Sequence, residues 1–374
     1  MYKCLEAEFK EIIRERCDVF ERAIDAIEKF KEWINSQRTR EIRVFHMGEK
    51  LLSKYFKIRG IDLSPRQLLV KAEESLESIK RGLRSIASEL NSSLGPADIL
   101  MSIASKKPAN FPAVLSAYKQ SIQEAKRVII EKDVASIPEE ELEVASVPLS
   151  LRATAEPTLY IPPGKYEVKK VGKLVIFPIK SEEDLKMHNT YMITHIAVRD
   201  GFPGKHLLYA WTVNNKSLVR QLIFAPETVE GWSAYVDDIM SEYGYLTSIR
   251  DRFLRLHSLL LNAALAIVDI RISLGETGIH DAIKFICREA FLSEEKALSQ
   301  VLRCVCMPGY QLSKFYGYEK FKVLRSKVKM ILNNYFNLKW FHDTILKTGI
   351  LPMKYLELLI LHKAVQHLII KRVS

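Results

Sequence analysis

Two segments carry most of the information in this sequence: His195-Ile-Ala-Val-Arg199-Asp200-Gly-Phe-Pro203-Gly204-Lys205-His206-Leu207 and, further on, Glu230-Gly231-Trp232-Ser233-Ala234-Tyr235. They place imidazole, guanidinium, ammonium and carboxylate groups close together in the sequence. Pro203 lacks an amide donor and the glycines on either side of it loosen the backbone, so a helix that enters the first segment can bend sharply. The main candidates for chemistry therefore lie here.

Most of the remaining chain shows helical spacing of apolar residues. The first 35 residues or so have the pattern of a long helix that buries one face. Ser64-Pro65-Arg66-Gln67 is a helix start in which the serine and Gln67 side chains cap each other. We expect further helices from 65 to about 90, over 112–132, over 253–270 and after Ser293.

Residues 133–165 differ, because they are rich in glutamate and proline and lack long apolar repeats. Valine, isoleucine and phenylalanine around Gly172 then predict a short hairpin made by 166–171 and 173–179. The expected fold class is mainly α with a small β-sheet. We expect an N-terminal helical region over 1–135, a connecting segment over 136–165 and a C-terminal region over 166–374, with one continuous domain as the alternative.

The two opening segments resemble, in order and spacing, an uncharacterised family of mostly helical, zincin-like metallopeptidases. Members of that family carry H-E-x-x-P-G-H-H and then E-G-W-A-x-Y. Four other stretches agree with the family's order and extend the resemblance over about 157–355; they are 157–163 (Y-x-P-P), 264–269 (A-R-L-V-V-D), 303–317 (R-Y-x-x-x-P-G-Q-A-L-S-Y-x-x-G) and 341–352 (F-H-D to G-x-L-P). The resemblance implies a zincin-like, helical metallopeptidase-type fold.

The resemblance also implies that this chain has a degenerate metal motif. Arg199 stands at the first histidine, Asp200 at the general-base glutamate, and Lys205-His206 at the histidine pair. Arginine cannot bind zinc, because it stays protonated and has no lone pair to offer. Trp232, Tyr235 and Arg303 match positions expected near a substrate cleft, whereas Leu265, Ser273, Gln300, Cys304 and Lys314 depart from the family.

The leading expectation is therefore an inactive relative of zinc metallopeptidases that keeps a cleft for a peptide or protein and has no cofactor. On this reading Arg199 or Lys205 neutralises Glu230, which would otherwise be unpaired in the absence of a cation. The alternative is an active hydrolase, carboxypeptidase-like, with zinc held by His195, His206 and Glu230. Eleven residues of straight helix span ~16 Å, so this alternative needs a sharp bend between the histidines.

The net charge of +11 is concentrated near the C-terminus, where residues 311–374 hold twelve Lys and Arg against three acidic residues. Lys322, Arg325 and Lys329 share one helix face, which makes a basic protein that associates with nucleic acid the third reading. The absence of a zinc-finger, RNP-like or phosphate-loop motif disfavours it. Charged residues directly after Met1, an odd number of cysteines and apolar runs of less than about 20 residues predict a cytoplasmic protein with no membrane segment.

Overall fold

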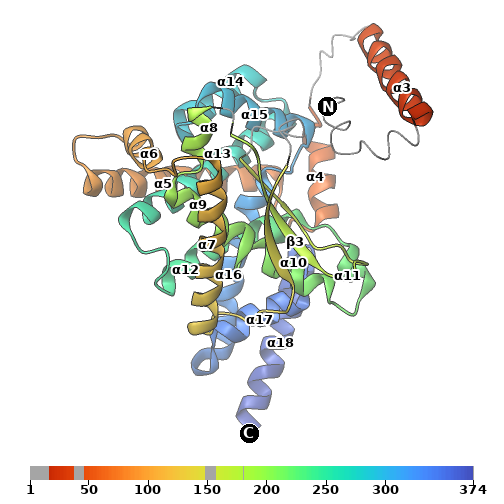
Figure 1. Ribbon diagram of the computed structural model, residues 1–374. Coiled ribbons are helices and arrows are strands. Elements are labelled where there is room, and N and C mark those ends of the chain that lie inside the picture. Colours follow the sequence, from red (N-terminus) through yellow and green to blue (C-terminus); the bar gives the residue numbers. More distant parts are fainter. Residues whose placement is uncertain (1–16, 38–45, 148–156, 180, 374) are drawn as a thin grey trace.

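The structure is a computed structural model that describes residues 17–37, 46–147, 157–179 and 181–373 (Figure 1). Helices dominate these residues and a three-stranded sheet accompanies them, which confirms the expected mainly α fold with a small sheet. In chain order the elements before the site are α3 (Cys17–Ser36), α4 (Gly48–Arg59), α5 (Pro65–Leu90), α6 (Pro96–Ser105), α7 (Phe111–Glu131), β1 (Glu141–Ser146), β2 (Thr158–Ile161), β3 (Val171–Ile176) and α8 (Glu182–Met187).

The remaining elements build the site and the core behind it. They are α9 (Thr190–Ile196), the π-helix η2 (Ala197–Gly201), α10 (Lys205–Val213), α11 (Leu218–Leu222), α12 (Pro226–Glu242), α13 (Ile249–Leu274), α14 (Ile279–Ala290), α15 (Glu294–Cys306), α16 (Leu312–Leu332), the 3-10 helix η3 (Asn333–Tyr335), α17 (Leu338–Thr348) and α18 (Met353–Val373). A single apolar core contains residues from the helices that precede the three strands in the chain and from those that follow them.

Two pairs of helices form the centre of the fold: α13 packs along α5, and α12 packs along α16. The second pair depends on two glycines. A Cβ on Gly231 would lie 2.5 Å from the Gly317 backbone, and one on Gly317 would lie 1.9 Å from the Glu227 carbonyl oxygen. Backbone atoms cannot yield as a flexible side chain can, so only glycine allows α12 and α16 to cross this closely.

The helix starts expected in the first half are confirmed. Ser64 and Gln67 form the reciprocal cap of α5, with Pro65 in its first turn. Asn110 accepts a hydrogen bond from the amide of Ala113 at the start of α7. These caps satisfy amide groups that have no partner within the helix.

The expected hairpin is wrong. β3 runs straight through Gly172, pairs in parallel with β1 and antiparallel with β2, and lies between them. Two of the three strands therefore come from the segment that we expected only to connect two regions. Gly172 serves close packing rather than a turn, because a Cβ there would lie 2.5 Å from His206 Nδ1.

The N-terminal helix also differs from expectation. The first 16 residues of the predicted helix lie outside the described part of the chain, but α3 confirms a helix over the rest. Its apolar face is not buried: Ile27, Phe30 and Trp33 are 56–59% exposed. Figure 1 shows α3 standing apart from the body of the molecule.

One helix of the described residues, α13, is long and apolar enough to cross a membrane by length and composition alone. Of its most apolar window, 67% is buried inside the fold. A core helix passes the same test, so the observation is weak evidence for a membrane span.

Candidate functional site

The segment 195–207 forms a tight turn between α9 and α10. α9 continues into the π-helix η2, and the Phe202–Pro203 peptide bond after it is cis. Gly204 lies so close to η2 that a Cβ would meet the Arg199 carbonyl oxygen at 1.9 Å. The indole of Trp232 donates to the Pro203 carbonyl at 2.8 Å and so fixes the turn to α12. The sharp bend that Pro203 and the two glycines allow is present.

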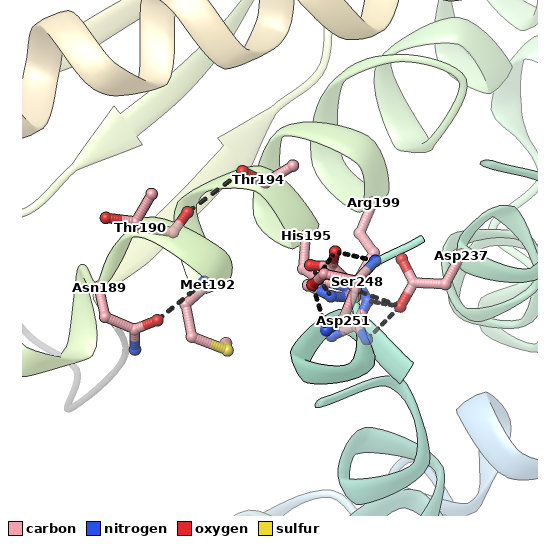
Figure 2. A network of polar contacts seen from close by, with 9 residues as sticks. All are labelled: Asn189, Thr190, Met192, Thr194, His195, Arg199, Asp237, Ser248 and Asp251. Atoms are coloured by element: carbon pink, nitrogen blue, oxygen red, sulfur yellow. Dashed lines mark hydrogen bonds and ion pairs between the residues drawn. The ribbon is translucent and has the colours of Figure 1, made fainter. Parts of the chain in front are cut away.

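Arg199 and His195 both converge on Asp237 of α12 (Figure 2). Arg199 donates from Nε at 2.8 Å and also from Nη2, and His195 Nδ1 lies 3.1 Å from the same oxygen, Oδ2. On the other side of the imidazole, Nε2 is 3.6 Å from Asp251 Oδ1 at the start of α13. His195 is fully buried, so α9, α12 and α13 meet around one histidine held between two carboxylates.

Lys205 is the centre of a second set of charges. Its Nζ lies 3.3 Å from Asp200 and 3.1 Å from Glu230. Lys314 of α16 approaches the other oxygen of Glu230 at 3.7 Å. The hypothesis that a cationic side chain neutralises Glu230 therefore agrees with the geometry for Lys205, whereas Arg199 neutralises Asp237 instead.

The pKa shifts follow these pairings. Burial alone would raise the pKa of Asp237, but Arg199 and His195 hold it at about 2. Burial alone would lower the pKa of His195, but Asp237 raises it above the usual value. Burial opposes the charged forms of Lys205 and Glu230 too, yet their attraction raises the pKa of Lys205 and lowers that of Glu230. Burial is the largest effect on Lys314 and lowers its pKa, with the positive charge of Lys205 adding to it.

Charge counting favours a protonated His195. With Lys314 charged, the site holds three cations and four carboxylates: Arg199, Lys205 and Lys314 against Asp200, Glu230, Asp237 and Asp251. A proton on His195 makes the charges equal. The raised pKa of His195 and its place between two carboxylates both favour the imidazolium.

His206 lies apart from this network. Its Nε2 donates to the Glu140 carbonyl at 3.2 Å, and its Nδ1 lies 3.2 Å from the Tyr160 hydroxyl. Burial lowers its pKa to about 4, so the ring is neutral and Nδ1 accepts from Tyr160. His206 therefore ties α10 to β2 and to the residue before β1.

The structure does not bring together the three ligands of the alternative zinc site. His195 faces Asp237 and Asp251, His206 faces Tyr160, and Glu230 faces Lys205 and Lys314. Within residues 17–37, 46–147, 157–179 and 181–373, no group of three or more His, Cys, Asp or Glu side chains is placed to hold a metal ion. An ammonium group occupies the space between Asp200 and Glu230, so the donor set there does not fit a divalent ion.

The other site residues expected from the sequence support the site from behind or lie at its edge. Trp232 and Tyr235 are fully buried and pack with Phe321 of α16, so in this structure neither presents its ring to a ligand. Arg303 is half-buried near the end of α15, within electrostatic reach of Tyr310.

The loop between α15 and α16 brings an aromatic surface next to the charges. Its backbone is fixed by Asp269, which accepts from the amides of Gly309 at 2.7 Å and Leu312 at 3.1 Å. Tyr310 in this loop is within electrostatic reach of Glu230 and Lys205, and its ring stacks on that of Phe224. Phe224 and three residues of α11, Leu218, Val219 and Leu222, are 61–64% exposed. An exposed apolar surface thus adjoins the paired charges.

The C-terminal basic stripe is partly neutralised. Arg325 donates from both terminal nitrogens to Glu242, each at 2.7 Å, and Lys322 lies 3.4 Å from Glu319. This reduces the charge that the face offers to a phosphate backbone.

Sequence reasoning missed Asp237, Asp251 and the position of Tyr310. Asp237 follows Glu230 by seven residues and so shares its helix face, which is a usable signal. Asp251 carries the signature of a helix cap with Ser248, and Figure 2 shows both beside His195. Only the tertiary fold shows that this cap also faces the histidine.

Taken together, the fold and site define a mainly helical protein in which a central turn carries a partly buried network of paired charges. The sequence profile of the family described as "Bacterial protein of unknown function (DUF885)" matches residues 4–360. The chain belongs to that family. No curated protein matches the chain.

Two proteins are among the solved structures that have the same fold. One is described as "the putative lipoprotein from Colwellia psychrerythraea" (21% identity, TM-score 0.76, 86% of this chain and 57% of that one). The other is "a putative lipoprotein of unknown function from Shewanella oneidensis" (22% identity, TM-score 0.79, 91% of this chain and 65% of that one). The chain thus spans less than two thirds of either structure's length.

These descriptions correct the expected cytoplasmic location. Both of these structures are described as putative lipoproteins, a class of protein that lies outside the cytoplasm, so the expectation of a cytoplasmic protein is wrong as an inference from the sequence. The charged residues after Met1 and the odd number of cysteines were insufficient grounds for the expectation.

Proposed function

We propose that this chain has a zincin-like fold, has lost zinc-dependent hydrolysis, and binds a peptide over the surface formed by Lys205, Glu230, Lys314 and the neighbouring α11. The single observation that carries the proposal is the position of the Lys205 ammonium group, 3.3 Å from Asp200 and 3.1 Å from Glu230. It supplies between these carboxylates the positive charge that a divalent ion supplies in a metallopeptidase.

The chemistry of the side chains supports the loss of hydrolysis. A zinc peptidase needs neutral imidazole or carboxylate ligands and a carboxylate that takes a proton from the bound water. Arg199 and Lys205 stand at two of the positions implied by the resemblance, and neither offers a lone pair while protonated. Asp200 stands at the position of the base, but it is paired with Lys205. No proton acceptor for water activation remains free at these positions.

The surface supports a peptide as ligand. Peptides carry a positive amino terminus, a negative carboxyl terminus and apolar side chains. The site offers an ammonium group in Lys314 for the carboxyl terminus, and the exposed apolar residues of α11 next to Phe224 and Tyr310 for apolar side chains, whereas Glu230 is already paired with two lysines. Lys314 is well suited to a ligand carboxylate, because at 3.7 Å it is only loosely engaged by Glu230.

The proposal is tested with one peptide mixture and two readouts. Tryptic peptides of denatured casein are incubated with the full chain, with and without added zinc; binding is measured by isothermal titration calorimetry and cleavage by mass spectrometry. We expect saturable binding and an unchanged peptide mass spectrum. Lys314→Met and Phe224→Ser should each weaken binding, whereas Lys322→Met, which removes an exposed lysine about two turns further along α16, should not.

The two halves of the proposal fail separately. Zinc-stimulated cleavage would contradict the loss of hydrolysis, even if peptides bind. Absence of binding, or binding that survives both Lys314→Met and Phe224→Ser, would contradict the assigned surface.

A further inference from the structure

A cavity of about 300 Å³ lies between α5, the start of α6 and the end of α14. Figure 1 shows α6 at the left of the molecule and α14 at its top, whereas α11 lies at the right. The cavity is therefore separate from the surface to which we assign peptide binding. Its volume is at the lower end of the range for small-molecule sites, which is about 300–1,000 Å³.

The charged part of the cavity lining is mainly positive. Lys80, Arg84 and Arg288 contribute three cations against one carboxylate, that of Glu289. Lys80 Nζ lies 2.7 Å from one oxygen of Glu289, and Nε of Arg288 donates to the other oxygen at 2.8 Å. Glu77 also pairs with Lys80, but it lies outside the lining and its side chain is 59% exposed, so water screens it. The lining is thus left with two more positive than negative charges.

The two arginines keep hydrogen-bond donors for a ligand. Arg84 forms no ion pair with any residue whose position the structure describes. Arg288 uses Nε for Glu289, and its guanidinium carbon lies 5.7 Å from the centre of the Phe285 ring, which helps to fix the group in place. Guanidinium groups present pairs of N–H donors whose spacing matches the oxygens of a phosphate.

The remaining lining is apolar and comes from Leu83, Pro96 and Phe291. Phe291 has a left-handed φ of 58°, which is rare and costly for a bulky residue. His257 holds it there, because its ring stacks on that of Phe291 with centroids 6.5 Å apart and its Nε2 donates to the Ala290 carbonyl at 2.8 Å. The aromatic wall of the cavity is therefore fixed by the fold.

We propose that this cavity binds a small molecule that carries a phosphate monoester and an apolar group. A phosphate monoester has a charge of about −1.5 to −2 at pH 7, which matches the excess positive charge of the lining. Its oxygens accept hydrogen bonds from Lys80, Arg84 and Arg288, and its apolar group lies against Leu83 and Phe291. A single carboxylate brings only half of the required charge.

Calorimetric titration of the full chain with phenyl phosphate tests the proposal. We expect saturable binding at one site per chain. Arg84→Met should weaken it about tenfold or more, because a hydrogen bond between two charged groups is lost. The folded structure should be unaffected, since Arg84 has no ion-pair partner among the described residues to leave behind. Arg81→Met is the matched control, because Arg81 is an exposed arginine of the same helix that does not line the cavity.

The charge of the ligand gives a second readout. Phenyl phosphate loses one negative charge as pH falls through about 6, so its binding should weaken several-fold between about pH 7.5 and 5.5. Benzenesulfonate has one negative charge at both pH values and should bind more weakly at the higher pH and change little. The hydrogen bond from Lys80 raises the pKa of that lysine, and the same contact with that of Arg288 outweighs burial and lowers the pKa of Glu289. The charges of these two groups therefore stay constant over this range.

Three results would overturn the proposal: no saturable binding of phenyl phosphate, an equal loss of binding in Arg84→Met and Arg81→Met, or benzenesulfonate that binds as tightly as phenyl phosphate. Inorganic phosphate should bind more weakly than phenyl phosphate, because it lacks a group to lie against Leu83 and Phe291. Equal affinities would contradict the apolar part of the assignment.

Discussion

The pairing of Lys205 with Glu230 is tested by removing each partner alone and then both. Lys205→Met deletes the ammonium group but keeps an unbranched chain of similar length. Glu230→Gln deletes the charge and keeps the shape of the carboxylate. The side chains are only 19% and 17% exposed, so a charge left without its partner is poorly compensated by water.

Removing one partner of a buried pair costs about 3–5 kcal/mol. Lys205→Met should fall below this range, at about 2–3 kcal/mol, because Lys314 still lies 3.7 Å from Glu230. Glu230→Gln should cost less, about 1–2 kcal/mol, because Lys205 keeps Asp200 at 3.3 Å. The double variant should cost less than the sum of the two single variants, because Glu230 is then no longer a charge without Lys205, while Asp200 has lost Lys205 in the double variant as in Lys205→Met.

The assay is urea unfolding followed by circular dichroism, because urea is uncharged and does not screen ion pairs as guanidinium chloride does. The control is the exposed pair Lys322 and Glu319, changed to Met and Gln in the same way, for which the coupling should stay under about 0.5 kcal/mol. Additive effects at Lys205 and Glu230, equal to the control, would refute the argument that this ammonium group compensates the carboxylate.

Three further predictions concern single residues. The raised pKa of His195 means that its pairing stabilises the fold fully below the unfolded pKa of about 6.5 and that this stabilisation is lost as pH rises through the higher folded pKa. NMR titration of the ring should show a pKa above 6.5, and a pKa at or below 6.5 would contradict the pairing. Burial raises the pKa of Asp269 to about 7, above its unfolded value, so the protonated side chain stabilises the fold at low pH and this stabilisation is lost as pH rises through about 7. Urea unfolding of Asp269→Asn should therefore show a smaller loss of stability between acid and alkaline pH than the wild type. An equal loss in both proteins would contradict the raised pKa. Gly231→Ala should destabilise the folded protein by about 3 kcal/mol or more, or prevent folding, because the Gly317 backbone lies 2.5 Å from the new Cβ. Gly278→Ala should be tolerated, because nothing lies within 4 Å of a Cβ there. Soluble yield and thermal unfolding of the two variants check this, and equal behaviour would contradict the close crossing of α12 and α16.

Local rules predicted the helices well. Ser64, Pro65 and Gln67 predicted the start of α5, and helical spacing predicted α7 and α13, because a cap and an apolar stripe are both encoded within a few turns. The sheet was harder to predict, since its register is set by strands far apart in sequence. Gly172 has the local signature of a turn, yet it lies within β3, where it pairs with Leu142 of β1 and leaves room for His206.

The candidate site was predictable in composition and only partly in geometry. The substitution of Arg199 and Lys205 into a metal-like motif indicated that positive charge had replaced ligands. Which carboxylate each would contact depends on the turn at Pro203, where η2 directs Arg199 to Asp237 and α10 directs Lys205 to Glu230. Exposure of α3 was not predictable either, because amphipathic spacing indicates a face that needs a partner but not where the partner lies.

Zinc binding by the full chain, purified without chelator and dialysed against equimolar zinc, tests the central claim most directly. If Lys205 and Arg199 supply the positive charge around these carboxylates, mass spectrometry of the dialysed protein should find far less than one zinc per chain. One zinc per chain, lost when Glu230 is replaced by Gln, would show that the carboxylates hold a metal and that the site is not closed by its own cations.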